Sequence, residues 1–212
     1  MDSLATPLQA FLRENRVLLR LFQRQVPYST PTGMWHNPEP FAIQSYAIAR
    51  LHDAWARFCR QLILLSAAGG ISTTAGAYVR RSPIVNQKQK PLDVLKLTYT
   101  KKRQKWVFWE PKWFDPWEAV QAAQALQIDN FPTVSAGLAL TGHGVDELRD
   151  CRNFILHRSR SSNRRLDPLR QRIGVSLSTS AEELVNVLTL GGGSIFEEWC
   201  IELAQRASLA AQ

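Results

Sequence analysis

FAIQSYAIARLHDAWARFCRQLILLSA, residues 41–67, is the segment from which the fold class follows. Its apolar side chains recur every three or four residues, a repeat that places them on one face of an α-helix. Gly69 and Gly70 come directly afterwards and are typical of a helix C-terminus. The segment therefore predicts a long helix that packs against another helix through the positions Ile43, Ala47, Leu51, Trp55, Phe58, Leu62 and Leu65.

Helix signals recur on both sides of this segment. Thr6 and Pro7 supply an N-cap and a first-turn proline for a helix from 7 to about 25. Asp115 and Pro116 open another helix, which we expect to end near residue 128. Further helices are expected after Pro132, over 145–158, over 181–190 and over 195–209, the last two each beginning with an S-x-x-E capping box.

Residues 70–114 have a different character and are expected to form an insertion. LKLTYT (95–100) and KWVFW (105–109) are rich in β-branched and aromatic residues, and they flank the basic segment KKRQ. This pattern predicts a basic β-hairpin over about 94–109. The aromatic residues from 106 to 117 either stack unpaired bases or form the core beneath the insertion. We therefore expect a mainly α-helical bundle, a single domain over 1–212, that carries an inserted basic hairpin.

The positive charge is segregated along the chain. Residues 80–112 carry ten basic and two acidic side chains, and residues 149–172 carry eight basic and two acidic ones. Because the net charge of the chain is +8, the remaining residues are net acidic, at −6. Two solvated basic loops would produce such a pattern, but a nucleic-acid-binding surface explains the segregation better.

The sequence also excludes several classes of protein. Three widely spaced cysteines fit reduced core thiols of a cytosolic protein better than a disulfide framework. Arginines interrupt the apolar residues at the N-terminus before a signal-peptide core can form, and no apolar run reaches the length of a membrane span. His52 precedes Cys59 by seven residues, but two ligands do not make a metal site, so we interpret His52 as a core or helix-surface histidine.

The segment VDELRDCRNFILHR, residues 145–158, carries the candidate chemistry. On a helical wheel, Val145, Leu148, Cys151 and Ile155 share an apolar sector, while Arg149, Asn153 and His157 lie along the polar side. Arg152 lies near the border of the apolar sector, about 140° from His157. A histidine placed near an arginine and a carboxamide can exchange protons beside a bound phosphate.

Arg152, Asn153 and, after three further residues, His157 resemble the catalytic motif of HEPN-domain ribonucleases. In that family an arginine, often followed by asparagine, precedes a histidine by four to six residues near the end of a long bundle helix. The resemblance implies an all-α bundle, a homodimer in which two motifs meet, and RNA cleavage without a metal or other cofactor. It assigns catalysis to Arg152, Asn153 and His157.

The same resemblance implies a toxin or anti-phage defence effector, with RNA as substrate, an antitoxin protein as a possible partner and a cytoplasmic location. The charge pattern adds candidate RNA-binding residues, which are Arg149, Arg158, Arg160, Arg164 and Arg165 near the motif and Lys101, Lys102, Arg103 and Lys105 at the turn of the expected hairpin.

Three other interpretations of these residues stay open. The arginine and histidine would also be favoured structurally near a helix C-terminus, because cations there interact well with the helix dipole. A non-catalytic HEPN-like module would bind RNA or a partner protein with the same surface. A sequence-independent DNA-binding protein would share only the charge.

Overall fold

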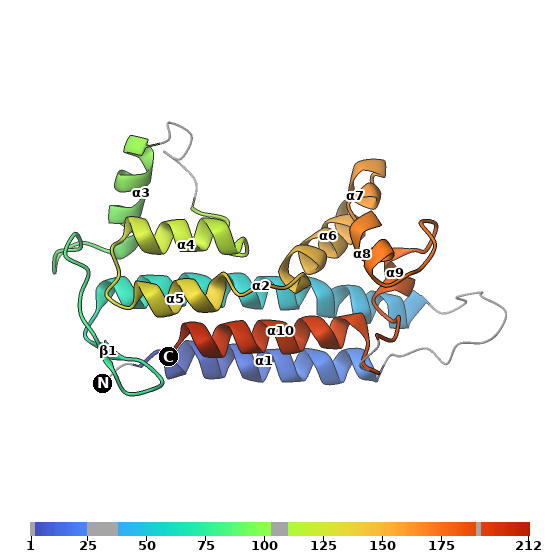
Figure 1. Cartoon of the computed structure of the whole chain (residues 1–212), viewed down its shortest axis with the longest axis horizontal. Coiled ribbons are helices and arrows are strands. Elements are labelled where there is room, and N and C mark those ends of the chain that lie inside the picture. Colours follow the sequence, from blue (N-terminus) through green and yellow to red (C-terminus); the bar gives the residue numbers. More distant parts are fainter. Residues whose placement is uncertain (1–2, 25–37, 103–109, 190–191) are drawn as a thin grey trace. The chain divides into compact units, whose positions relative to one another are not determined.

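The computed structural model describes residues 3–24, 38–102, 110–189 and 192–212. This part of the chain is mainly helical, as expected, and contains one small antiparallel pair of strands (Figure 1). None of its helices is both long and apolar enough to cross a lipid bilayer.

Contacts within the chain define two compact units. The first comprises Met1–Leu12, Ala54–Thr141 and Ala204–Gln212, and the second comprises Arg13–Asp53 and Gly142–Leu203. Three helices contribute residues to both units: α1 (Ala5–Gln23), α2 (Pro38–Ala68) and α10 (Ile195–Ala210). They confirm the helices predicted over 7–25, 41–67 and 195–209.

The first unit contains an aromatic cluster and the whole of the segment Ala54–Thr141. Phe11 lies 5.9 Å from Trp55 and 5.4 Å from Phe58, measured between ring centroids. Helices α4 (Pro116–Ala125) and α5 (Phe131–Leu138) run side by side (Figure 1). Asp115 caps α4 as predicted, because its carboxylate accepts hydrogen bonds from the backbone N–H groups of Trp117 and Glu118.

The turn after α2 requires glycine. Gly69 has a φ of +66°, in the left-handed region, and a Cβ there would collide with the backbone of Arg81. The chain reverses and forms the strands β1 (Ile71–Ser72) and β2 (Tyr78–Val79), which pair antiparallel with Ile71 opposite Val79. The small hairpin therefore lies at the start of the predicted insertion.

The predicted hairpin over 94–109 is wrong in its described part. Residues Pro91–Lys102 form a helix, α3, and 103–109 lie outside the described residues. Pro91 fits the first turn of a helix, and Asp93 complements the positive N-terminal end of its dipole. Val94 and Leu95 are buried. Local helix-start signals and tertiary burial thus outweigh the β preference of LKLTYT.

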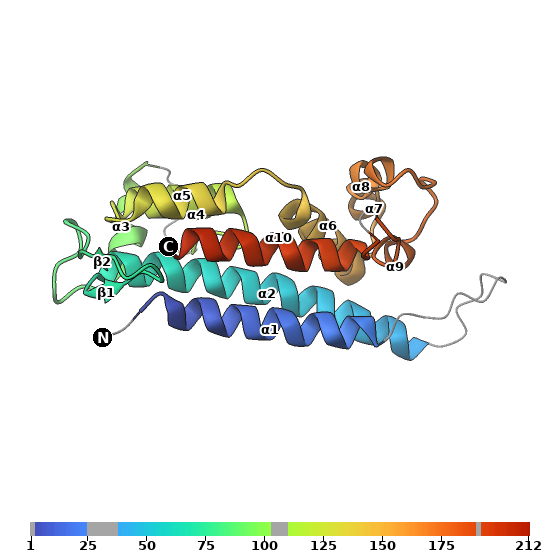
Figure 2. The same ribbon diagram turned by 60° about the horizontal axis from the view of Figure 1, so that its bottom comes forward.

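The second unit contains α6 (Gly144–His157), α7 (Arg160–Arg164), α8 (Asp167–Arg172) and α9 (Ala181–Leu184) with parts of α1, α2 and α10. Phe22 stacks on Phe196 at 4.2 Å in its core, and the Asn15 amide donates to the Cys200 carbonyl. Figure 2 shows α7, α8 and α9 grouped near the end of α6.

One predicted helix of this unit is shorter than expected. The Ser180 capping box forms with Glu183, but α9 ends at Leu184 rather than near residue 190. The backbone then pairs Leu188 with Ser194 in an isolated antiparallel bridge. The helix is shorter because the backbone N–H and C=O groups around this bridge, including the Thr189 N–H that donates to the Gly193 carbonyl, bond across the turn and not along a helix.

Candidate active site on helix α6

Helix α6 carries the motif predicted over 145–158, and its burial follows the predicted wheel. Val145, Leu148 and Cys151 are buried, while Ile155 is only partly covered. Glu202 caps the N-terminus of α6, because its Oε2 accepts a 2.9 Å hydrogen bond from the Gly144 N–H. A side chain at position 144 would press into this carboxylate, which explains the glycine.

Two carboxylates hold Arg149 on the polar side of α6. Its guanidinium lies 2.7 Å from Asp146 Oδ1 and 3.1 Å from Asp150 Oδ1. Both carboxylates neutralise charge that would otherwise be offered to a phosphate. Arg149 is a candidate RNA contact by its sequence position. Its two carboxylate neighbours make it less suited to bind a phosphate than the arginines that follow α6.

Arg152 and Asn153 contact each other at the centre of the motif. Nη1 of Arg152 donates a 3.3 Å hydrogen bond to Oδ1 of Asn153, and both side chains are partly buried. Nε of Arg152 is fully buried, and no acceptor within hydrogen-bond range exists among the described residues. The guanidinium is thus restrained through Nη1 and keeps donors that a phosphate can use.

His157 is the last residue of α6 and is exposed. A cation in this position complements the negative end of the helix dipole. Arg158 follows as the C-cap in a left-handed conformation, with a φ of 42°, and its guanidinium lies 5.4 Å from the ring centroid of Phe41. The sharp turn at Arg158 ends the helix and leaves the His157 imidazole accessible to solvent.

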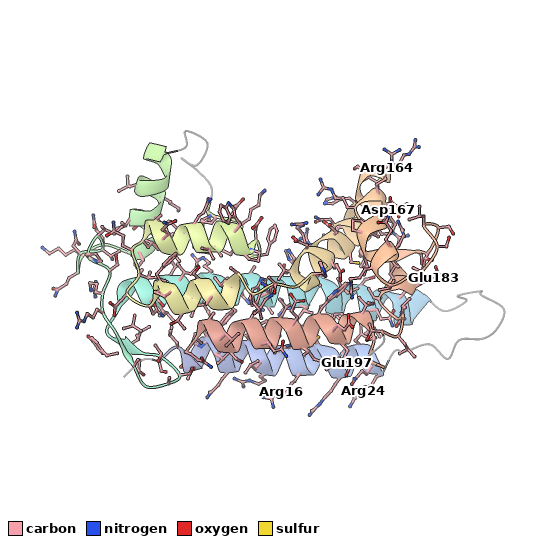
Figure 3. All side chains as sticks on the ribbon, viewed as in Figure 1. Arg16, Arg24, Arg164, Asp167, Glu183 and Glu197 are labelled. Atoms are coloured by element: carbon pink, nitrogen blue, oxygen red, sulfur yellow. The ribbon has the colours of Figure 1, made fainter. Side chains whose placement is uncertain are left out.

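Exposed arginines cover the short helix that follows. Arg160, Arg164 and Arg165 are exposed, and within the described residues they form no ion pair with a carboxylate. Figure 3 shows Arg164 projecting away from the ribbon of α7. We call these three residues the α7 cationic surface. It begins two residues after Arg158 and is suited to contact phosphates near His157.

Two further arginines of the same cluster are structural. Arg170 is 2% exposed, and its guanidinium donates to the Thr179 and Asn163 carbonyls, the Asn163 side chain and Asp167. Arg172 binds Glu147 with two hydrogen bonds of 2.7 and 2.8 Å and also contacts Glu198. These contacts tie α8 to α6 and α10, so they hold the α7 cationic surface in place.

The lysine-rich candidates cannot be placed as RNA contacts. The backbone of Lys101 and Lys102 ends helix α3, while their side chains, together with the whole of Arg103 and Lys105, lie outside the described residues. Trp113 is buried and Trp117 is 69% exposed. The described part of the aromatic run therefore contains both a core residue and an exposed ring.

His52 is a buried histidine on which the charges of the motif act, and no local sequence pattern predicts this. It lies on α2, is 7% exposed, and its Nδ1 is 3.5 Å from Oδ1 of Asp53. Burial lowers the pKa of His52, the Asp53 hydrogen bond opposes that effect, and the positive charges of Arg152 and Arg149 reinforce it. Only the packing of α6 beside α2 brings these groups together (Figures 1 and 2).

A second row of arginines lies on α1, where the charge pattern of the sequence does not predict a basic surface. Arg13, Arg16, Arg20 and Arg24 are exposed and recur every three or four residues, so they share one side of the helix. In Figure 3 Arg16 and Arg24 point to the side opposite Arg164. The second unit thus has basic side chains on two different faces.

The described residues contain no group of three or more His, Cys, Asp or Glu side chains that could hold a metal ion. The three cysteines are free and buried, and burial raises the pKa of the Cys59 and Cys200 thiols, so neither is suited to act as a nucleophile. No family model, curated protein or solved structure matches the chain.

Proposed function

We propose that the protein is a HEPN-like, metal-independent endoribonuclease that cleaves single-stranded or loop RNA. The observation that carries this proposal is the arrangement at the end of α6. An exposed histidine, His157, follows a partly buried Arg152–Asn153 pair and precedes the α7 cationic surface. A proton-transfer group, a charge stabiliser and a phosphate-binding surface thus lie within one short segment.

In the proposed reaction the RNA 2′-oxygen attacks the adjacent phosphorus while the bond from phosphorus to the 5′-oxygen breaks. The products are a 2′,3′-cyclic phosphate and a 5′-hydroxyl. A base accepts the proton of the 2′-hydroxyl, and an acid gives a proton to the leaving oxygen. His157 is suited to proton transfer, because imidazole can donate or accept a proton near neutral pH.

Arg152 stabilises the negative charge that develops on the phosphate in this proposal. Its guanidinium supplies the compensating positive charge, so the proposed reaction uses no metal ion. Asn153 acts on Arg152, because the 3.3 Å hydrogen bond restricts where the guanidinium can point. The α7 cationic surface binds neighbouring phosphates and keeps the chain of the substrate near His157.

A homodimer completes the proposed site. One imidazole cannot serve as base and acid in the same step, and Arg152 and His157 diverge on the helix, so two copies of α6 facing each other supply both groups. In the toxin or defence role that the resemblance of the motif implies, an antitoxin protein would cover the exposed motif.

A non-catalytic RNA-binding module is the second candidate. It is favoured by the α7 cationic surface, which would bind a phosphate backbone whether or not His157 transfers protons. Binding of RNA without cleavage in every condition tested would support this candidate over the nuclease.

Labelled RNA incubated with the protein in EDTA tests the nuclease proposal. We expect cleavage by the wild type and a loss of about 10²- to 10³-fold in kcat for Arg152→Ala, because a preorganised charge stabiliser is removed. Arg20→Ala is the matched control, since it removes an exposed arginine of the same unit that lies on α1, away from the α7 cationic surface, and should change kcat little. Equal kcat values for the wild type and Arg152→Ala would contradict the assignment.

A further inference from the structure

We propose that Arg158, supported by the ring of Phe41, is a stacking site for an unpaired base next to the reacting phosphate. The proposal rests on the proposed function of the α6 site and names the part of the RNA, besides its phosphates, that this site recognises. The charge pattern of the sequence indicates only a phosphate contact for Arg158.

The contact between Arg158 and Phe41 joins two elements of the second unit. Arg158 ends α6, and Phe41 lies in the first turn of α2. The central carbon of the guanidinium lies over the ring, 5.4 Å from its centroid, within the range of a cation–π interaction. Phe41 is half-buried and Arg158 is exposed. The ring therefore restricts the guanidinium on one side, while solvent can still reach the side chain.

The backbone at Arg158 has a conformation that favours glycine. Its φ is 42°, in the left-handed region, where side chains are strained and glycine is the usual residue after a helix. Its N–H donates a 2.7 Å hydrogen bond to the Phe154 carbonyl, which fixes the point from which the side chain leaves the backbone. An arginine in this conformation is expected where its side chain makes a contact that glycine lacks.

A planar guanidinium offers RNA two kinds of contact. Its N–H groups lie in the plane and bind phosphates, whereas its faces stack on flat rings. A base that stacks on Arg158 uses a face, so the proposed site does not depend on which hydrogen bonds the edge of the guanidinium makes. A base exposes its own face only when it is unpaired, and such bases commonly stack on aromatic rings and on arginine. The expected ligand is therefore an unpaired base of single-stranded or loop RNA.

The position of Arg158 in the chain determines which nucleotide it contacts. Its Cα atom is about 3.8 Å from that of His157, as for any two consecutive residues. Arg160, the first residue of the α7 cationic surface, comes two residues later. With the reacting phosphate at His157, the base on Arg158 belongs to a nucleotide that flanks this phosphate. Because a purine has a larger face than a pyrimidine, we expect a purine preference at that position.

A single base on an otherwise bare backbone tests the stacking site without requiring catalysis. The probe is a short 2′-O-methyl ribose-phosphate chain that carries one adenine, and the reference is the same chain without the base. Both have the same charge, so their difference in affinity measures the base contact alone. We expect the wild type to bind the adenine-bearing chain about tenfold more tightly. Equal affinities for the two chains, or binding of neither, would overturn the proposal.

Arg158→Lys separates stacking from charge and from packing. Lysine keeps the positive charge and can still lie over the Phe41 ring, but it has no planar face. We expect the preference for adenine to fall below about twofold, with unchanged affinity for the bare chain and unchanged circular dichroism. Arg20→Lys makes the same exchange at an exposed arginine of α1 and should keep the full preference. An undiminished preference in Arg158→Lys would contradict the assignment.

Two variants of Phe41 test the support that its ring gives to Arg158 as a positioning residue. Phe41→Tyr keeps an aromatic face beneath the guanidinium and should keep the adenine preference. Phe41→Leu keeps an apolar side chain without that face and should lower the preference about threefold. Circular dichroism checks that both variants fold. The same preference in Phe41→Leu as in Phe41→Tyr would show that the ring does not position Arg158.

Failure of the nuclease proposal would be visible separately. An adenine preference that depends on Arg158, in a protein that cleaves no RNA, would support the stacking site and reject only the nuclease. RNA cleavage without any adenine preference in binding would reject the stacking site and leave the nuclease proposal intact.

Discussion

Arginines near the motif serve two different purposes, which burial and partners distinguish. Arg170 is enclosed by acceptors from three residues, whereas Arg164 points outward. The sequence presents both as members of one basic cluster. The structural role of Arg170 depends on contacts with Asn163 and Thr179, and no local sequence pattern predicts these contacts.

Replacing Arg170 should therefore destabilise the fold. Arg170→Ala removes a buried guanidinium and leaves several partly buried acceptors without donors, and we expect the free energy of unfolding to fall by about 3 kcal/mol. Arg164→Ala should change it by less than about 0.5 kcal/mol, because an exposed side chain is removed. Urea unfolding followed by circular dichroism measures both. A similar stability for the two variants would show that Arg170 does not anchor the segment.

His52 should make stability depend on pH on the acid side. Its pKa is lowered from 6.5 in the folded chain, so the unfolded chain binds the proton more readily. The corresponding stabilisation is fully present above pH 6.5 and is lost as the pH falls through the folded pKa.

Urea unfolding at about pH 7.5 and about pH 5.5 isolates this contribution. The wild type should lose more free energy of unfolding between these two values than His52→Gln, which has no titrating ring. If the two proteins lose the same amount, His52 is not held neutral in the folded state.

The α7 cationic surface should provide the electrostatic contribution to RNA binding. Each phosphate contact on single-stranded RNA contributes about 0.7 to the slope of log affinity against log salt. Replacing Arg160, Arg164 and Arg165 with glutamine should thus reduce the slope by about 2 and weaken binding without moving the cleavage sites.

The chain offers a control of equal charge on the opposite side of the same unit. Replacing Arg13, Arg20 and Arg24 on α1 removes three exposed arginines and should leave the slope unchanged if α7 is the binding surface. A slope that falls equally in both variants would show that only the total charge matters.

Elements with strong local signals were predictable, and those decided by tertiary contacts were not. The long repeat in α2, the Asp115 cap and the Ser180 box all appear where the sequence places them. LKLTYT became helical because Pro91 and Asp93 suit a helix start and Val94 and Leu95 are buried. The wheel located Arg152 at the border of the buried face of α6, but His52 comes from α2 and has no local signature.

At the scale of the whole molecule, the proposed site needs a second copy of the chain. Leu156 lies one helical turn after Arg152 and is 52% exposed, beside the exposed His157. A two-fold contact between α6 helices would cover this side chain. Sedimentation should accordingly show a homodimer at assay concentrations.

Leu156→Glu should shift the protein to a monomer and reduce RNA cleavage, because two carboxylates would face each other across the axis. Leu177→Glu is the control, since Leu177 is also exposed in the second unit, at 58%. A dimer that survives Leu156→Glu, or a fully active monomeric wild type, would contradict the two-fold site.

RNA cleavage through His157 is the reaction that we propose for the end of α6. Its most direct test compares the wild type, His157→Ala and His143→Ala on labelled RNA in EDTA, with identification of the product ends. His143 is exposed at the other end of α6 and makes no side-chain capping bond, so it controls for loss of a surface histidine.

We predict 2′,3′-cyclic phosphate products from the wild type and His143→Ala, and a rate lowered by about 10²- to 10⁴-fold in His157→Ala with unchanged helical circular dichroism. Undiminished cleavage by His157→Ala, or no cleavage by any of the three proteins, would contradict the account.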